Sequence, residues 1–241
     1  MTQNNLSHLP VEEELRGRIS WLIRLRWVAL AAILVSVSLT KHLFHIPLPE
    51  REIYLVSLGI FLYNAIFFLY LKRLERCNSA EIFSRFAFIQ ILLDWLALIL
   101  LIHYTGGIES PVILYFFFHA LISSILLSPK NFYLQPTLGV FLLGMVAILE
   151  YKGVIGHVTL SGFITNSHYQ NPIYVFGILF FFATALYVST YLSTSIIKKL
   201  RERDRELINL KMNAEEAYQR IQTLYSLSNT ISSTLDLKEV S

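Results

Sequence analysis

Long apolar runs alternate with short polar connections along the chain, and this pattern predicts helices that cross a membrane. A crossing helix needs about 20 apolar residues to span roughly 30 Å of hydrocarbon. Six runs approach that length, at about 27–45, 53–71, 86–104, 111–128, 132–150 and 173–197. The pattern therefore predicts an all-α fold, with a six-span transmembrane helical bundle over residues 27–197.

Residues 1–26, ahead of the first run, have the features of a cytoplasmic amphipathic helix. Pro10 and the acids at 12–14 suit a first helical turn, where proline is tolerated and negative charge meets the positive end of the helix dipole. Apolar residues then recur at helical spacing, with Trp21, the adjoining Trp27 and four arginines nearby. We expect this helix to lie on the inner membrane face and to run into the first span.

A heptad pattern follows the last apolar run, over residues 198–226. Apolar residues fall seven apart, with others at the intervening positions: Leu200, Leu207, Leu210, Ala214, Ala217, Ile221 and Leu224. This spacing favours a cytoplasmic, parallel, two-stranded coiled coil and hence a homodimer. The alternative is a single amphipathic helix that packs on a partner outside this chain.

The distribution of basic residues predicts the orientation. The chain is 54% hydrophobic and only 15% charged, where soluble proteins average about 25% charged. Three basic residues, Lys41, Arg51 and Lys152, fall on one side of the predicted spans. The other side collects Arg16, Arg18, Arg24, Arg26, Lys72, Arg73, Arg76, Arg85, Lys130, Lys198, Lys199, Arg201, Arg203 and Arg205.

By the positive-inside rule, both termini are cytoplasmic in a multi-pass protein of the inner (plasma) membrane. Cys77, between the second and third spans, is then also cytoplasmic. The basic residues serve topology and contact with the lipid bilayer, so we expect no nucleic-acid partner. A lone cysteine excludes an intrachain disulfide and a cysteine-based zinc site, and we expect no metal centre. The longest outer connection, 151–172, is either a plain connector or a ligand surface.

Asp94 lies near the middle of the third predicted span. A carboxylate at that depth costs roughly 2.5–3.5 kcal/mol, so it faces the bundle interior with a partner or a task. If the third and fourth spans form an antiparallel hairpin, His119 comes to the same level. We therefore predict an intramembrane Asp94–His119 pair that either moves a proton or holds the helices in register. Asn64 and Gln90 are expected to join it as structural hydrogen-bonding groups.

The connection between these two spans is glycine-rich, with Gly106 and Gly107 ahead of Ser110 and Pro111. Two glycines permit positive φ and let a flat ring approach the backbone, and a proline suits the first turn of the next helix. The segment is either a tight turn alone or a turn that also contacts a small molecule.

Residues 94–111 resemble the third span and outer hairpin of membrane-bound sensor histidine kinases of the RegB type. That family has six spans, an Arg-Trp pair at the first span, matched by Arg26 and Trp27, and a Gly-Gly…Asn-Pro-Phe segment implicated in ubiquinone binding. Here Ser110 replaces the asparagine and Val112 the phenylalanine. The resemblance implies a redox or quinone-responsive sensor whose ligand-binding residues are Gly106, Gly107, Ser110 and Pro111.

Residues 224–240, Leu-Tyr-Ser-Leu-Ser-Asn-Thr-Ile-Ser-Ser-Thr-Leu-Asp-Leu-Lys-Glu-Val, resemble the opening helix of a GAF domain. So short a segment cannot bury a core of its own. The resemblance implies that residues 227–241 are the truncated start of a GAF domain.

Taken together, these features predict the input module of a sensor histidine kinase. Its partners are then the downstream GAF and kinase domains of the same protein and a response regulator. The chain itself carries no phosphate-binding loop and no nucleophile elbow. Whether this chain is an enzyme is left open. The alternative function is a small membrane transporter or a membrane redox protein. Against a transporter, we see no matching pair of Gly/Pro-broken spans.

Overall fold

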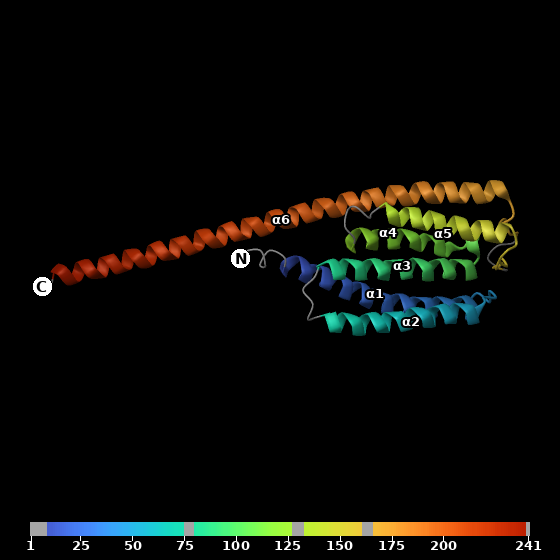
Figure 1. Ribbon diagram of the computed structural model, residues 1–241, viewed down its shortest axis with the longest axis horizontal. Coiled ribbons are helices and arrows are strands. Elements are labelled where there is room, and N and C mark those ends of the chain that lie inside the picture. Colours follow the sequence, from blue (N-terminus) through green and yellow to red (C-terminus); the bar gives the residue numbers. More distant parts are fainter. Residues whose placement is uncertain (1–8, 75–79, 127–132, 161–165, 240–241) are drawn as a thin grey trace. The chain divides into compact units, whose positions relative to one another are not determined.

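A computed structural model describes residues 9–74, 80–126, 133–160 and 166–239, and these contain six α-helices and no strand. They are α1 (Leu9–His42), α2 (Glu50–Arg73), α3 (Ala80–Tyr104), α4 (Tyr115–Leu126), α5 (Leu134–Tyr151) and α6 (Pro172–Glu239), shown in Figure 1. Two short 3₁₀ helices, η2 (Gly107–Glu109) and η3 (Pro111–Leu114), link α3 to α4. The predicted all-α fold is confirmed. Cys77 lies outside the described residues.

Five of these helices are long and apolar enough to cross a membrane. The fourth predicted span is shorter, because residues 111–114 form η3 and leave α4 only 12 residues. Together η3 and α4 make an apolar segment from Pro111 to Leu126. Large apolar side chains such as Leu62 and Ile66 of α2 and Phe181 of α6 are exposed, which suits a surface that faces lipid.

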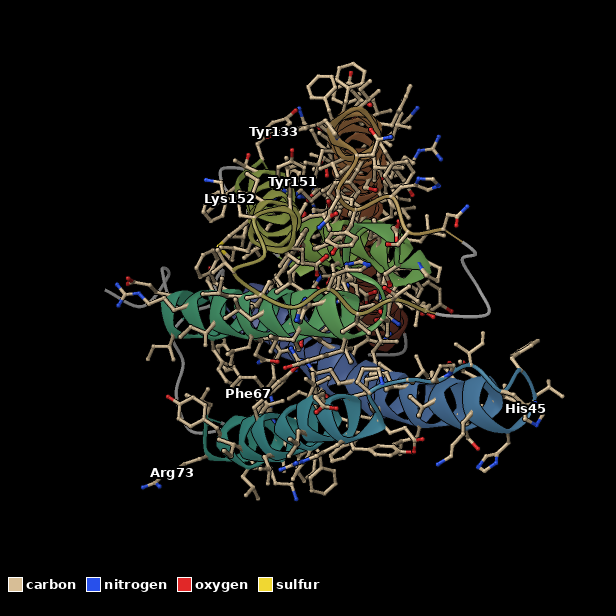
Figure 2. The ribbon with its side chains drawn as sticks, turned by 90° about the vertical axis from the view of Figure 1, so that its right-hand side faces the viewer. His45, Phe67, Arg73, Tyr133, Tyr151 and Lys152 are labelled. Atoms are coloured by element: carbon tan, nitrogen blue, oxygen red, sulfur yellow. The ribbon has the colours of Figure 1, made fainter. Side chains whose placement is uncertain are left out.

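The chain forms two compact units, Met1–Thr194 and Ser195–Ser241. In the first unit α3 packs against α1, α2, α4 and α5. Phe67 lies on the side of α2 that faces α3 (Figure 2), where its ring meets that of Phe86 at 5.4 Å. Within the described part of the second unit, residues 195–228 are almost all exposed.

The core of the first unit is centred on Trp95 of α3, which has no exposed surface. Its ring lies 5.0 Å from that of Phe116 on α4, and Phe116 meets Phe182 of α6 at 5.2 Å. Gly139 of α5 makes room for the indole, since a Cβ there would stand 2.2 Å from the Trp95 ring. Aromatic packing thus joins α3, α4, α5 and α6.

The predicted boundary at residue 26 does not appear as a break, because α1 is one helix from Leu9 to His42. Ile19, Leu22 and Ile23, predicted on the membrane surface, are at most 2% exposed and belong to the main core. Residues 15–26 are therefore an integral part of the bundle. The opposite end of the first unit, which carries residues 105–111, 152–160 and 166–171, is called the hairpin end below.

Candidate functional site

A buried ion pair between Arg26 of α1 and Asp94 of α3 lies inside the bundle. Arg26 Nε donates to Asp94 Oδ1 at 2.8 Å, and Nη2 donates to Oδ2 at 2.9 Å. The two residues are 4% and 9% exposed. Two parallel bonds of this kind are the strongest geometry that a guanidinium and a carboxylate make. The pair therefore fixes α1 against α3.

Three neutral side chains complete the hydrogen bonding of this pair. Arg26 Nη1 donates to Gln90 Oε1 at 2.7 Å and to Asn64 Oδ1 at 3.3 Å. The Tyr63 hydroxyl donates to Asp94 Oδ1 at 2.8 Å. Since Tyr63 and Asn64 belong to α2, the network joins three helices. A buried charge pair is tolerated when its remaining donors and acceptors are satisfied in this way.

The partner of Asp94 in the structure is Arg26, not the predicted His119. His119 Nδ1 instead lies 3.0 Å from the carbonyl oxygen of Tyr115, one turn earlier in α4, and its ring meets the edge of Trp95 at 6.0 Å. The connection from α3 to α4 consists of two 3₁₀ helices and not of a tight turn. Asn64 and Gln90 bond to Arg26 and not to the carboxylate.

A cavity of about 500 Å³ adjoins the ion pair. Asp94 and His119 both line it, so the structure brings the two predicted residues to one space without a direct bond. Most of its wall is aliphatic. The polar groups on the wall come from Arg26, Ser36, Thr40, Tyr63, Asp94, Thr105, Tyr115 and His119.

The hairpin glycines adopt the backbone that the sequence suggests, with φ of 112° at Gly106 and 56° at Gly107. Ser110 Oγ accepts from the backbone N–H of Val112 at 3.2 Å and lies 2.7 Å from the Thr105 hydroxyl. Ser110 therefore caps η3, and Pro111 occupies the first turn of η3 and not that of an α-helix.

The space beside Gly107 is filled by a side chain. A Cβ at Gly107 would stand 2.1 Å from Oε2 of Glu150, the buried acid at the end of α5. A Cβ at Gly106 would meet Leu160 at 3.4 Å. The close approach that these glycines allow is thus made by the protein itself. Of the four predicted ligand-binding residues, only Pro111 lines the cavity.

Sequence reasoning missed Arg26 as a site residue and also missed an acidic pair at the hairpin end, Glu109 and Glu150. Both acids are buried, and each faces His157 of the connection between α5 and α6. A signal for Glu150 was present, because it is the one acidic residue of the apolar fifth run. The same holds for Glu109, the only charged residue of the glycine-rich hairpin.

Comparison with known proteins gives one family. The family model of the PilS-like transmembrane domain, a six-span domain, matches residues 10–203. PilS, after which the family is named, is a sensor histidine kinase. No curated protein and no solved structure matches the chain.

Proposed function

The chain belongs to the family of PilS-like transmembrane domains, and on that premise we propose that it is the membrane input module of a two-component sensor histidine kinase. The observation that carries this proposal is the extent of the match, which begins in α1 and ends at residue 203, within α6. In this proposal both termini are cytoplasmic and the membrane is the inner (plasma) membrane. A GAF domain, a kinase core and a response regulator act downstream.

The second unit supports a dimeric output. Its apolar heptad residues are exposed: Leu200, Leu207, Leu210, Ile221 and Leu224 are 55–66% exposed. A second copy of the same helix buries such a stripe by knobs-into-holes packing, whereas a lone helix leaves it in water. We therefore propose that residues 198–226 form a parallel coiled coil between two copies. A change of packing in the membrane unit biases this coil as a population shift.

Cysteine cross-linking tests both the dimer and its role. With Cys77→Ser as background, Leu210→Cys should form an interchain disulfide readily, because position 210 lies in the predicted seam. Asn209→Cys, its neighbour off the seam, should cross-link far less. When the chain is fused ahead of a histidine-kinase core in nanodiscs, the disulfide at 210 should also change the autophosphorylation rate.

Equal cross-linking at 209 and 210 would contradict the coiled coil. Efficient cross-linking at 210 with an unchanged autophosphorylation rate would instead contradict the input role. The cross-linking result therefore tests the dimer, and the autophosphorylation rate separately tests the input role.

We further propose that the cavity beside Arg26 and Asp94 binds a quinone. Its volume lies within the range of about 300–1,000 Å³ typical of small-molecule sites. Arg26 Nη2 uses one N–H on Asp94, which leaves its second N–H to donate to a quinone carbonyl. Since the Tyr115 carbonyl can only accept, His119 carries its hydrogen on Nδ1. In the neutral ring, Nε2 is then an acceptor for a quinol hydroxyl.

A cavity-filling substitution tests this site. Purified protein in nanodiscs should bind a short-chain ubiquinone or menaquinone analogue saturably by calorimetry. Ala97→Phe should weaken binding at least about tenfold, because Ala97 lines the cavity and an added ring occupies ligand volume. Leu96→Phe is the matched control, since Leu96 is exposed and does not line the cavity. Absence of saturable binding, or equal binding by the two variants, would exclude a quinone from this cavity.

A further inference from the structure

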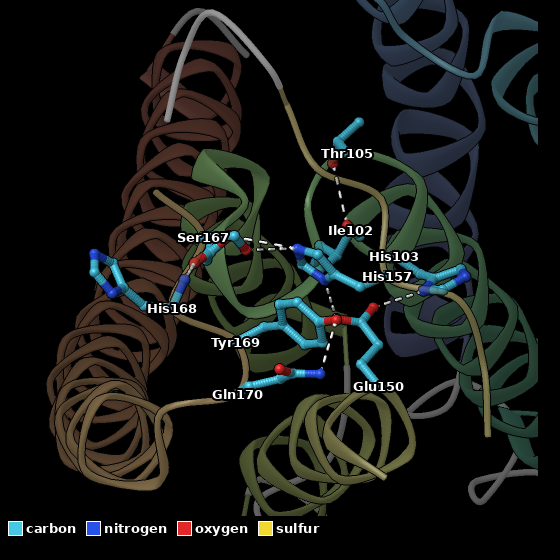
Figure 3. Close-up of polar contacts among 10 residues, drawn as sticks. Ile102, His103, Thr105, Glu150, His157, Ser167, His168, Tyr169 and Gln170 are labelled. Carbon is cyan, nitrogen blue, oxygen red and sulfur yellow. Dashed lines mark hydrogen bonds and ion pairs between the residues drawn. The ribbon is translucent and has the colours of Figure 1, made fainter. Parts of the chain in front are cut away.

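The hairpin end holds a second buried ionic cluster, formed by Glu109, Glu150, His103, His157 and Ser167 and here called the hairpin-end cluster. Figure 3 labels Glu150, His103, His157 and Ser167 of this cluster. The cluster joins α3, η2, α5 and the connection between α5 and α6. The side chains of Glu109 and Glu150 are 1% and 0% exposed, and that of His157 is 2% exposed. Two carboxylates and an imidazole are thus withdrawn from water together.

Each oxygen of Glu150 contacts the ring nitrogen of a histidine. Oε1 lies 2.7 Å from His103 Nδ1, and Oε2 lies 2.7 Å from His157 Nδ1. A carboxylate has no hydrogen to donate. A proton must therefore lie in each of these two contacts, on the ring nitrogen or on the carboxyl group.

The second ring nitrogen of His157, Nε2, also faces oxygen atoms. Nε2 lies 3.4 Å from Glu109 Oε2 and 3.3 Å from Ser167 Oγ. The Ser167 hydroxyl donates its own hydrogen to Glu109, at 2.8 Å, so it has none for the imidazole. With both carboxylates ionised, hydrogen on both nitrogens of His157 matches the acceptors around the ring, and this is the imidazolium form.

Loss of that proton leaves a nitrogen lone pair against a carboxylate oxygen. In a site with almost no exposed surface, the Nε2 lone pair and the Glu109 carboxylate repel each other, and only the Nδ1–H still joins His157 to a carboxylate, that of Glu150. The contact of His157 with Glu109 of η2 is therefore favourable only while both ring nitrogens carry hydrogen, whereas the contact with Glu150 of α5 needs hydrogen on Nδ1 alone. Because this stabilisation requires the bound proton, it is present at low pH and is lost when that proton leaves.

No other group that packs on His157 in the described part of the chain supplies a substitute charge. From its own connection, Tyr169 stacks on the imidazole at 4.0 Å and 11°, and the backbone N–H of His168 donates to Glu109. The His168 ring is exposed and faces Tyr174 of α6 at 5.3 Å. Lys152, the nearest cation along the chain, is exposed at the end of α5.

The connection held by this cluster leads directly into α6. Asn171 Oδ1 accepts from the backbone N–H groups of Ile173 and Tyr174, so the residue after His168–Gln170 caps the helix. We propose that the hairpin-end cluster is a proton-operated clasp. Protonated His157 bridges Glu150 of α5 and Glu109 of η2 and so strengthens the attachment of residues 166–171 ahead of α6, and deprotonation loosens that attachment.

Hydrogen exchange tests the clasp in the intact chain in nanodiscs. Amide protection of residues 166–171, corrected for chemical exchange, should fall about tenfold as pH rises through the range of about 5–8 in which histidines titrate. His157→Gln, which cannot change charge, should abolish this pH dependence. His168→Gln is the matched control, because it keeps its backbone N–H and leaves the cluster intact.

A second variant keeps the proposal testable if His157→Gln does not fold. Glu109→Gln removes one of the two anions that favour the imidazolium, so release should then occur at lower pH. Protection that is independent of pH in the natural chain would overturn the clasp. So would a His157→Gln variant that keeps the transition, or a Glu109→Gln variant whose transition moves to higher pH.

Discussion

Asp94→Ala is expected to lower the free energy of unfolding by about 3–5 kcal/mol, because it leaves the Arg26 guanidinium buried without its counter-charge. Replacing both partners with apolar residues, as in Arg26→Met with Asp94→Leu, should cost less than either single change, since neither charge is then stranded. Reversible unfolding of the purified protein in mixed micelles measures Asp94→Ala, Arg26→Met, Asp94→Leu and the double variant, and the last three yield the coupling energy.

Glu81→Ala provides the matched control for a salt bridge on the same helix. Glu81 pairs with Arg85 at 2.5 Å, but both side chains are more than 70% exposed. Such a pair contributes at most about 1 kcal/mol. Two results would contradict a stabilising buried ion pair between Arg26 and Asp94. One is a loss of stability in Asp94→Ala no larger than that in Glu81→Ala. The other is a loss in the double variant equal to the sum of the losses in its two single variants.

The membrane helices could be predicted because lipid imposes their length. Predicted spans at 53–71, 86–104 and 132–150 compare with helices at Glu50–Arg73, Ala80–Tyr104 and Leu134–Tyr151. Hydropathy detects the apolar run but not the type of helix within it. The fourth run therefore could not reveal that residues 111–114 form a 3₁₀ helix ahead of α4.

The need of Asp94 for a partner follows from its burial, but the identity of that partner depends on which helix approaches. The count of basic residues groups Arg26 with three neighbouring arginines at the membrane surface. The helical periodicity of α1 argues against this grouping. Arg26 lies seven residues after Ile19 and four after Leu22, on the same buried face of the helix as Leu30. Helical phase is therefore the signal in the sequence that places Arg26 on the inward face of α1.

The hairpin-end cluster could not be assembled from the sequence. Glu109, Glu150 and His157 lie on three segments with no common periodicity, and the irregular connection sets where His157 falls. Glycine carried a partial signal, because positive φ at 106 and 107 was predicted from residue type. The group that occupies the space next to Gly107 depends on how α5 packs, and no local sequence pattern predicts that packing.

Gly107→Ala should therefore destabilise the protein by about 2–5 kcal/mol. Roughly 1–2 kcal/mol comes from a side chain at positive φ, and about 1–3 kcal/mol comes from overpacking against the Glu150 carboxylate, 2.1 Å from the added Cβ. Gly153→Ala isolates the first contribution, since Gly153 has φ of 67° and nothing within 4 Å of its Cβ position. Unfolding of both variants in mixed micelles should show Gly107→Ala as clearly the more costly. Equal losses would mean that Glu150 does not occupy the space beside Gly107, and the hairpin would then be open to a ligand.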